Sequence, residues 1–77
     1  MREVVTTNLE NELGQAKLKC VVLAFRYLME ADKEEKHFEI NFCNFDEGRG
    51  KRVWCVIDEY PESEGGRTIT YLLPADY

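Results

Sequence analysis

Serine and histidine, two of the residue types of a serine–histidine–acid triad, are scarce in this 77-residue chain. The chain has one histidine, His37, and one serine, Ser63, so a serine–histidine–acid triad would have to join these two residues. Ser63 lies in the sequence PESEGG, which is typical of a solvent-exposed turn and contains nothing to activate the hydroxyl group. We therefore expect no catalytic residue and predict that the protein is not an enzyme.

The three cysteines do not have the spacing of a metal site. Cys20, Cys43 and Cys55 are 23 and 12 residues apart, whereas a zinc site needs four ligands that usually come in close pairs. We expect no metal and no cofactor. Three is an odd number, which favours reduced thiols over a disulfide framework. A Cys43–Cys55 bridge stays open only if the strand register brings these two residues together.

One glycine-rich segment superficially resembles a phosphate-binding loop. It is the sequence GRGKR at residues 48–52. A dinucleotide-binding loop follows a strand and begins a helix, whereas this segment lies between two strand-like runs. The sequence therefore predicts a hairpin turn that carries positive charge.

The chain as a whole has the composition of one small globular domain, residues 1–77. It is 44% apolar and 32% charged, with a net charge of −5. No apolar run approaches the roughly 18–20 residues that cross a bilayer, and the first residues lack the apolar core of a secretion signal. We expect a cytoplasmic protein without membrane contact. A domain of this size buries only about 60% of its unfolded surface, so a partner would help to stabilise it.

Apolar residues recur with helical spacing from residue 9 onward, and the pattern Thr7–Asn8–Leu9–Glu10 predicts an N-cap at Thr7. The helix is expected to end near residues 32–36. A helix on a small sheet needs one apolar stripe, so a second stripe points to a covering segment, a partner or a second copy of the chain. The first stripe is Leu9, Leu13, Ala16, Cys20, Leu23 and Tyr27, and the second is Leu18, Val22, Phe25 and Met29.

Three later runs, residues 37–45, 52–60 and 67–73, alternate apolar and polar residues as strands do. The short turns between them imply antiparallel neighbours. The predicted fold is α+β and two-layered, with one long helix packed on a three-stranded antiparallel sheet (αβββ). A short strand at residues 2–6 would make it βαβββ.

The pairing of the first two runs decides which residues face the helix. Pairing Phe45 with Arg52 would place Phe42 opposite Cys55 and Ile40 opposite Ile57. A slip of one residue would exchange the faces and bury Trp54 in the core, and the sequence leaves both arrangements open. In the first register the helix-facing residues are Phe38, Ile40, Phe42, Val53, Cys55, Ile57, Ile69, Tyr71 and Leu73. The opposite face then holds Glu39, Asn41, Cys43, Trp54, Val56, Asp58 and Tyr60.

Acidic side chains are concentrated in the second part of the chain. Residues 37–77 contain four basic and eight acidic side chains, and four of the acidic ones, Asp58, Glu59, Glu62 and Glu64, fall within seven positions. This balance opposes direct binding to nucleic acid. It favours contact with a basic protein surface, although a solvent-exposed turn has the same composition.

These features favour a binding module over an enzyme. In size, acidity and lack of catalytic residues, though not in any motif, the chain is similar to the inhibitors that phages encode against host defences, such as anti-CRISPR and anti-restriction proteins. That similarity implies a non-enzymatic inhibitor or adaptor in the host cytoplasm. Its partner would be another protein with a basic surface, such as a nucleic-acid-binding protein. We expect the contact residues to be Trp54, Tyr60, Phe25, Asp58, Glu59, Glu62 and Glu64.

A second hypothesis is a small homodimer that binds an anionic ligand such as a nucleotide. The surplus helical stripe would form the dimer contact. The ligand-binding residues would be Arg49, Lys51, Arg52 and Arg67.

Overall fold

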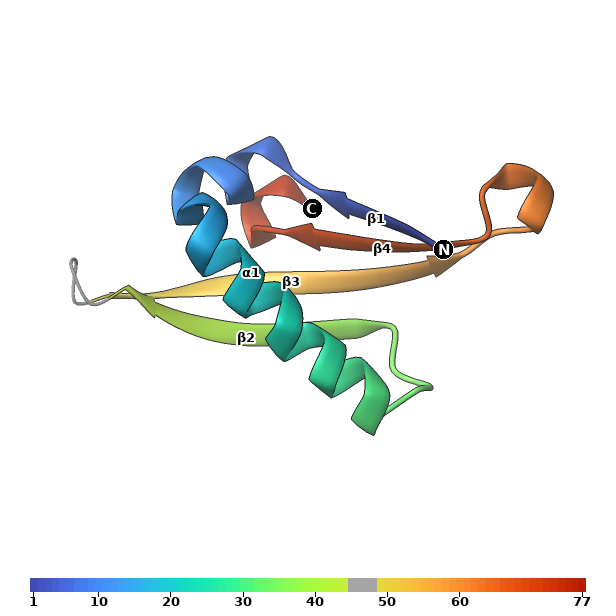
Figure 1. The fold of residues 1–77 in the computed structure, drawn as a ribbon, viewed down its shortest axis with the longest axis horizontal. Helices are drawn as coiled ribbons and strands as arrows, with labels where there is room; N and C mark the ends of the chain where they lie inside the picture. Colours follow the sequence, from blue (N-terminus) through green and yellow to red (C-terminus); the bar gives the residue numbers. More distant parts are fainter. Residues whose placement is uncertain (45–48) are drawn as a thin grey trace.

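One long helix packs on a four-stranded sheet in the computed structural model of the chain (Figure 1). The structure describes residues 1–44 and 49–77, with the side chains of residues 1–41 and 51–77. This arrangement confirms the predicted α+β class. In chain order the elements are β1 (Arg2–Val5), α1 (Thr7–Ala31), β2 (His37–Asn44), β3 (Arg49–Glu59), the 3-10 helix η1 (Glu62–Glu64), β4 (Arg67–Leu72) and the 3-10 helix η2 (Pro74–Asp76).

The strand order in the sheet is β1-β4-β3-β2. β2, β3 and β4 are antiparallel neighbours as predicted, while β1 adds a fourth strand that runs parallel to β4. The sheet is therefore mixed rather than antiparallel throughout. The reason is the connection: α1 crosses the sheet diagonally and returns the chain, so β2 runs in the same direction as β1 (Figure 1). Two antiparallel pairings, β2 with β3 and β3 with β4, then give β4 the direction of β2, which makes β4 parallel to β1. None of the described helices is long and apolar enough to span a bilayer.

The pairing of β2 with β3 differs from the register that pairs Phe45 with Arg52, which was one of the two arrangements left open by the sequence. Phe38 lies opposite Cys55, where Phe42 was expected. The shift is four residues, because Arg52 pairs with Asn41 and the two strands already meet at Asn44 and Arg49; the expected partner Phe45 lies outside the described residues. Side chains alternate along a strand with a period of two, so an even shift leaves every residue on its predicted face.

The helix begins one residue earlier than the capping pattern predicted. Thr6, and not Thr7, is the N-cap: its backbone is extended (φ −69°, ψ 147°) and its hydroxyl oxygen accepts a hydrogen bond from the amide of Leu9 at 3.4 Å. Thr7 is already helical, because β1 ends at Val5 and leaves a single extended residue before the first turn. The C-terminal end at Asp32 agrees with the prediction.

Gly14 interrupts the helix and explains the two apolar stripes. Its φ of 75° and ψ of 168° are not helical, and glycine adopts them without the penalty that a β-carbon would bring. In an uninterrupted helix, Val21 would lie about 80° around the axis from Leu13. With the break, both residues are buried against the same sheet. The core therefore uses the start of the first stripe and much of the second, and it leaves Leu23 and Tyr27 exposed.

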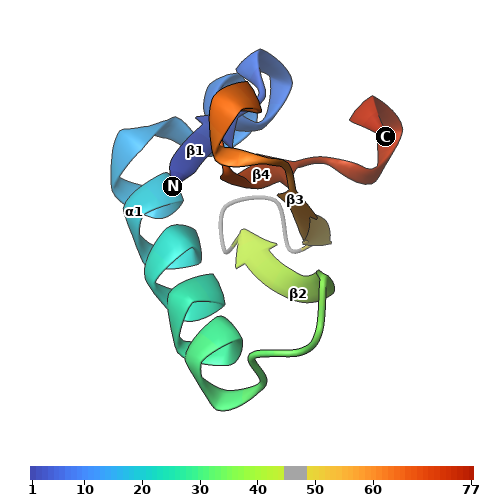
Figure 2. The same ribbon diagram turned by 90° about the vertical axis from the view of Figure 1, so that its right-hand side faces the viewer.

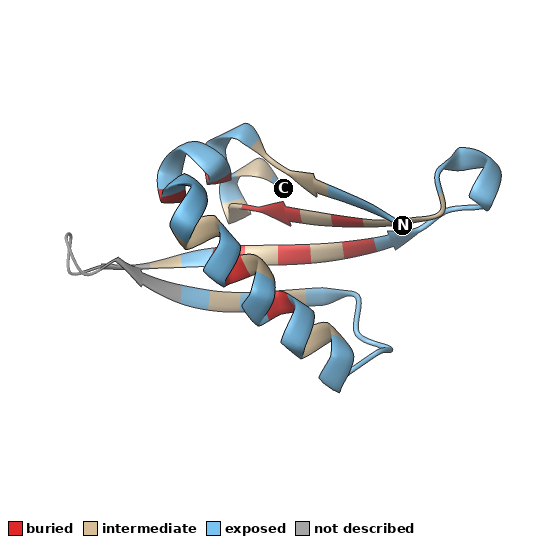
Figure 3. Cartoon of the chain, viewed as in Figure 1, coloured by how far each residue is buried: buried red, intermediate tan, exposed pale blue. Residues whose placement is uncertain are grey.

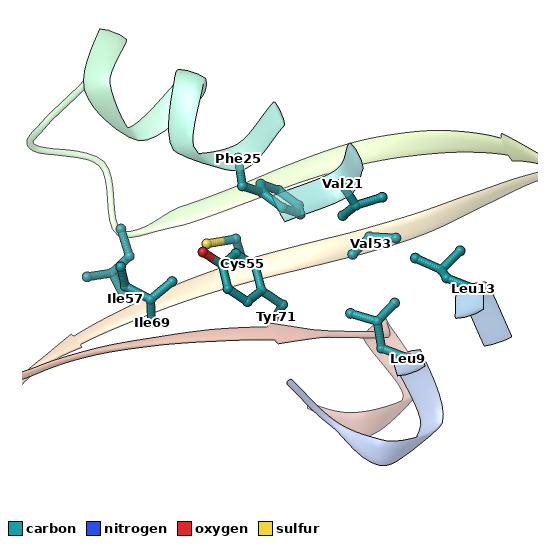
Figure 4. Close-up of a cluster of buried hydrophobic side chains, with 9 residues drawn as sticks. All are labelled: Leu9, Leu13, Val21, Phe25, Val53, Cys55, Ile57, Ile69 and Tyr71. Atoms are coloured by element: carbon teal, nitrogen blue, oxygen red, sulfur yellow. The ribbon is translucent and has the colours of Figure 1, made fainter. Parts of the chain in front are cut away.

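The core lies between α1 and the sheet face formed by β3 and β4, and Figure 4 shows these side chains meeting there. Phe38, Ile40 and Leu73 pack against its margin as predicted. Cys55 is a free thiol at the centre, so it does not take part in the bridge to Cys43 that the sequence had left open. The buried cluster of the described residues is Leu9, Leu13, Val21, Phe25, Val53, Cys55, Ile57, Ile69 and Tyr71.

Candidate functional site

The sheet face opposite α1 carries a cluster of three aromatic rings. Figure 2 shows the helix on one side of the sheet and the C-terminal turn on the other. The ring of Trp54 on β3 lies 4.7 Å from that of His37 and 5.6 Å from that of Tyr77, both edge to face, measured between centroids. Trp54 is half-buried on this outer face and not part of the core. Its indole Nε1 is covered and has no acceptor among the described residues.

The C-terminal turn is held against the sheet by Asp76. Asn8 donates to one carboxylate oxygen at 2.7 Å, and the Thr6 hydroxyl donates to the other at 3.0 Å. These hydrogen bonds favour the ionised form, and the one from Asn8 contributes most to lowering the pKa of Asp76. The turn places Tyr77 beside Trp54 and leaves Leu72 only 4% exposed, although Leu72 is on the outer face.

A shallow hollow lies next to this aromatic cluster. Its volume is about 290 Å³, and it is lined by Val56, Asp58, Thr70, Leu72, Asp76 and Tyr77. The lining combines two aliphatic side chains, one aromatic ring and two carboxylates. A lysine or arginine side chain of another protein would match this combination, because its aliphatic stem prefers apolar contacts while its charged end seeks carboxylates.

The four acidic residues predicted to act together do lie at one end of the sheet. Asp58 and Glu59 end β3, and Glu62 and Glu64 lie in η1, the turn that leads into β4 (Figure 1). All four are exposed. Glu59 is paired with Lys36 at 2.8 Å, and that hydrogen bond lowers the pKa of Glu59. No ion pair of Asp58, Glu62 or Glu64 occurs among the described residues.

Two aromatic residues predicted to contact a partner differ in exposure. Tyr60 is 49% exposed and lies between the acidic residues of β3 and η1. Phe25 is fully buried, with its ring 5.9 Å from that of Tyr71. Phe25 is therefore not available to a partner, because the break at Gly14 rotates its stripe toward the sheet.

The four cations of the ligand-binding hypothesis do not come together. Lys51 pairs with Glu12, and Arg52 pairs with Glu39 at 3.4 Å. Arg67 lies opposite Glu59, at the end of β3 distant from its start at residue 49. The side chain of Arg49 lies outside the described residues. A single anion-binding site built from these four cations would have to span the length of β3.

Sequence reasoning missed His37, Asp76 and Tyr77 as parts of this surface. The chain offers no local signal for them, since they meet Trp54, Thr6 and Asn8 only through the folded sheet. Within the described residues, no three His, Cys, Asp or Glu side chains are grouped in a way that could hold a metal ion.

Comparison of the chain with protein-family models, with curated protein sequences and with solved structures gives no match. Its function is therefore inferred from geometry.

Proposed function

We propose that this protein is a non-enzymatic binding module that docks on another protein with a basic surface through the outer face of its sheet. The observation that carries the proposal is the hollow beside Trp54, where aliphatic and aromatic side chains meet the carboxylates of Asp58 and Asp76. Large aromatic residues at the centre of an interface contribute much of the binding energy in known complexes.

The carboxylate of Asp76 is well suited to receive a cation. Its hydrogen bonds to Thr6 and Asn8 hold it in place and keep it ionised, as its lowered pKa indicates. A partner's guanidinium or ammonium group would then meet an ordered charge and would lose little further entropy on binding.

The exposed acidic residues of η1 serve a different role. Fully exposed charges contribute little to affinity once they are bound, but they attract a partner of opposite charge before contact. Glu62 and Glu64 would speed association, and the net charge of −5 acts in the same direction.

The partner class follows from this charge distribution. Proteins that bind nucleic acid carry basic grooves lined with lysine and arginine, which is the surface that an acidic module fits. In this proposal the protein is an inhibitor or adaptor of such a partner, as anti-CRISPR and anti-restriction proteins are of theirs, and it acts in the host cytoplasm.

The test begins with co-purification from the native host and identification of the partner by mass spectrometry. Kinetics are then measured with the purified partner and with Asp58→Asn, Tyr77→Ala and the double variant E62Q/E64Q. We expect the first two to raise the dissociation constant about tenfold or more. The double variant should mainly slow association and weaken its salt dependence.

A matched control removes the same charge elsewhere. Glu10 and Glu34 are exposed and lie on the helix and on the turn that follows it, so E10Q/E34Q should leave the dissociation constant unchanged. Unchanged binding of Asp58→Asn and Tyr77→Ala, or a loss of affinity in the control, would contradict docking through the outer face.

A further inference from the structure

The outward side of α1 presents apolar residues that nothing in the described chain covers. Leu23 is 62% exposed and Tyr27 is 77% exposed. They lie one turn apart, on the side of the helix opposite the buried Val21 and Phe25. Figure 3 shows that α1 is exposed along most of its length, with buried residues at intervals. A shallow hollow of about 330 Å³ runs along the same side, and its lining includes Leu18, Val22 and Leu23.

The exposed residues Leu23 and Tyr27 form the outer stripe of α1, and the charges at its two ends have opposite signs. Lys19 lies one turn before Leu23, and Glu30 lies one turn after Tyr27; both are exposed on the same side of the helix. Arg26, another cation of this side, is paired with Glu3 at 3.0 Å. Glu30 is paired with Lys33 at 3.3 Å, but the exposed acids Asp32, Glu34 and Glu35 follow, so this end of the helix is acidic. The stripe is therefore basic at its N-terminal end, apolar in the middle and acidic at its C-terminal end.

This pattern is complementary to itself when two helices run antiparallel. We propose that two copies of the chain form a dimer about a two-fold axis near residues 24 and 25 of α1. In this register Leu23 of each copy packs against Tyr27 of the other, and Lys19 of each copy faces Glu30 of the other. A parallel pairing would instead place each lysine beside its own counterpart.

The dimer is independent of the proposed binding of a basic partner. The helix and the outer sheet face lie on opposite sides of the molecule (Figure 2), so each surface stays open when the other is occupied. A contact centred on one helix of about three turns is small, and interfaces of this size are usually weak. We expect a dissociation constant in the micromolar range.

Sedimentation equilibrium over a wide range of protein concentrations tests the proposal. The wild-type chain should approach twice the monomer mass, while Leu23→Ser and Tyr27→Ser should stay monomeric. Both residues are exposed in the single copy, so their circular dichroism and thermal midpoint when dilute should match the wild type. A wild type that is monomeric throughout, or a dimer that both variants retain, would overturn the proposed interface.

Charge exchange tests the antiparallel register. Lys19→Glu should weaken the dimer about tenfold, because it creates two repulsive pairs. The double variant K19E/E30K restores both pairs with their signs exchanged and should recover most of the affinity. Failure of the double variant to recover would contradict this register.

Disulfide trapping provides a second measure of the same geometry. In a background with Cys20→Ser and Cys43→Ser, the variant K19C/E30C should form an interchain disulfide on oxidation. Within one helix these positions are about 16 Å apart and cannot be bridged. The single variant K19C should not be trapped as a dimer. Trapping of K19C alone would favour a parallel pairing and would overturn the proposal.

Discussion

Cys55 and Tyr71 are ionisable side chains placed at the centre of the core, opposite one another on β3 and β4. Burial raises the pKa of Cys55 to about 11 and that of Tyr71 to about 12, and the nearby carboxylate of Glu3 adds to both increases. The Tyr71 hydroxyl donates to that carboxylate at 3.4 Å, so its proton has a fixed acceptor. Both groups are neutral at physiological pH and behave as parts of the apolar core.

The first prediction concerns alkaline pH. Both pKa values are higher in the folded chain than their ordinary values of 9.0 and 10.0, so the unfolded chain loses these protons first. Stability is therefore complete below pH 9 and is lost progressively as the pH rises from 9 toward the folded pKa values of about 11 and 12. We expect the free energy of unfolding to fall by about 2 kcal/mol between pH 8 and pH 10.5. Urea denaturation followed by circular dichroism measures it.

The variant Cys55→Val separates the two groups. It keeps a small apolar side chain on β3 and removes the thiol. The remaining alkaline loss should begin about one pH unit higher, near the ordinary value of 10.0 at which Tyr71 ionises in the unfolded chain. Equal stability of the wild-type chain at pH 8 and pH 10.5 would show that these groups are not protected from solvent.

At the scale of the element, α1 works as two helical segments with different rotations about one axis. Gly14 separates them, and each segment turns its own apolar residues toward the sheet. The same break turns Leu23 and Tyr27 outward. The positive φ of one glycine thus decides which side of the helix forms the core and which side remains available to a second copy.

The second prediction is that Gly14→Ala destabilises the fold by about 1–3 kcal/mol. A β-carbon at this position would meet no atom within 4 Å, so the cost comes from the backbone conformation and not from a clash. The neighbouring Gln15→Ala, on an exposed helical residue, should change stability by less than about 0.5 kcal/mol. Urea denaturation compares the three proteins. A Gly14→Ala variant as stable as the wild type would contradict the need for a positive φ.

At the scale of the whole molecule, contacts between distant parts of the chain connect its two layers. Asp76 joins the C-terminal turn to the start of α1 through Asn8 and Thr6. The same turn covers part of the outer sheet face and packs Tyr77 on Trp54. The helix side of the molecule and the candidate binding surface are therefore physically linked.

The third prediction tests this link. In Asp76→Ala the turn should detach from α1, which should shift the fluorescence emission of Trp54 to longer wavelength and lower the thermal midpoint. The pKa of Asp76 is lowered in the folded chain, so its contribution is complete above the ordinary value and is lost as the pH falls through the lowered pKa. The wild-type and variant midpoints should therefore converge in acid.

Glu10→Gln serves as the control, because Glu10 is an exposed acid in the first turn of α1 and is not among the described residues that hydrogen-bond to Asp76. Its emission spectrum should match that of the wild type. A variant at Asp76 with an unchanged spectrum would indicate that Tyr77 holds its position by ring contacts alone.

Local patterns predicted the elements of this fold, but not the contacts that depend on distant residues. Alternation with a period of two grouped Val53, Cys55 and Ile57 on one face of the sheet, but it left open whether that face or the face of Trp54 meets the helix. It also could not distinguish registers four residues apart. The helical stripes were correct in spacing, and only the positive φ of Gly14 showed which part of each is buried. Of the candidate site, Trp54 and the acidic turn were predicted, whereas the tail that completes it had no local signal.

The pairing of β1 with β4 has a consequence for synthesis on the ribosome. β4 lies between β1 and β3, and Arg2 pairs with Thr68. The strand made first therefore has no partner until residues beyond 67 have left the exit tunnel. Until then Leu9, Leu13 and Phe25 lack half of the sheet that buries them. Until β4 emerges, the nascent chain exposes this apolar surface, and we expect ribosome-associated chaperones to bind it at that stage.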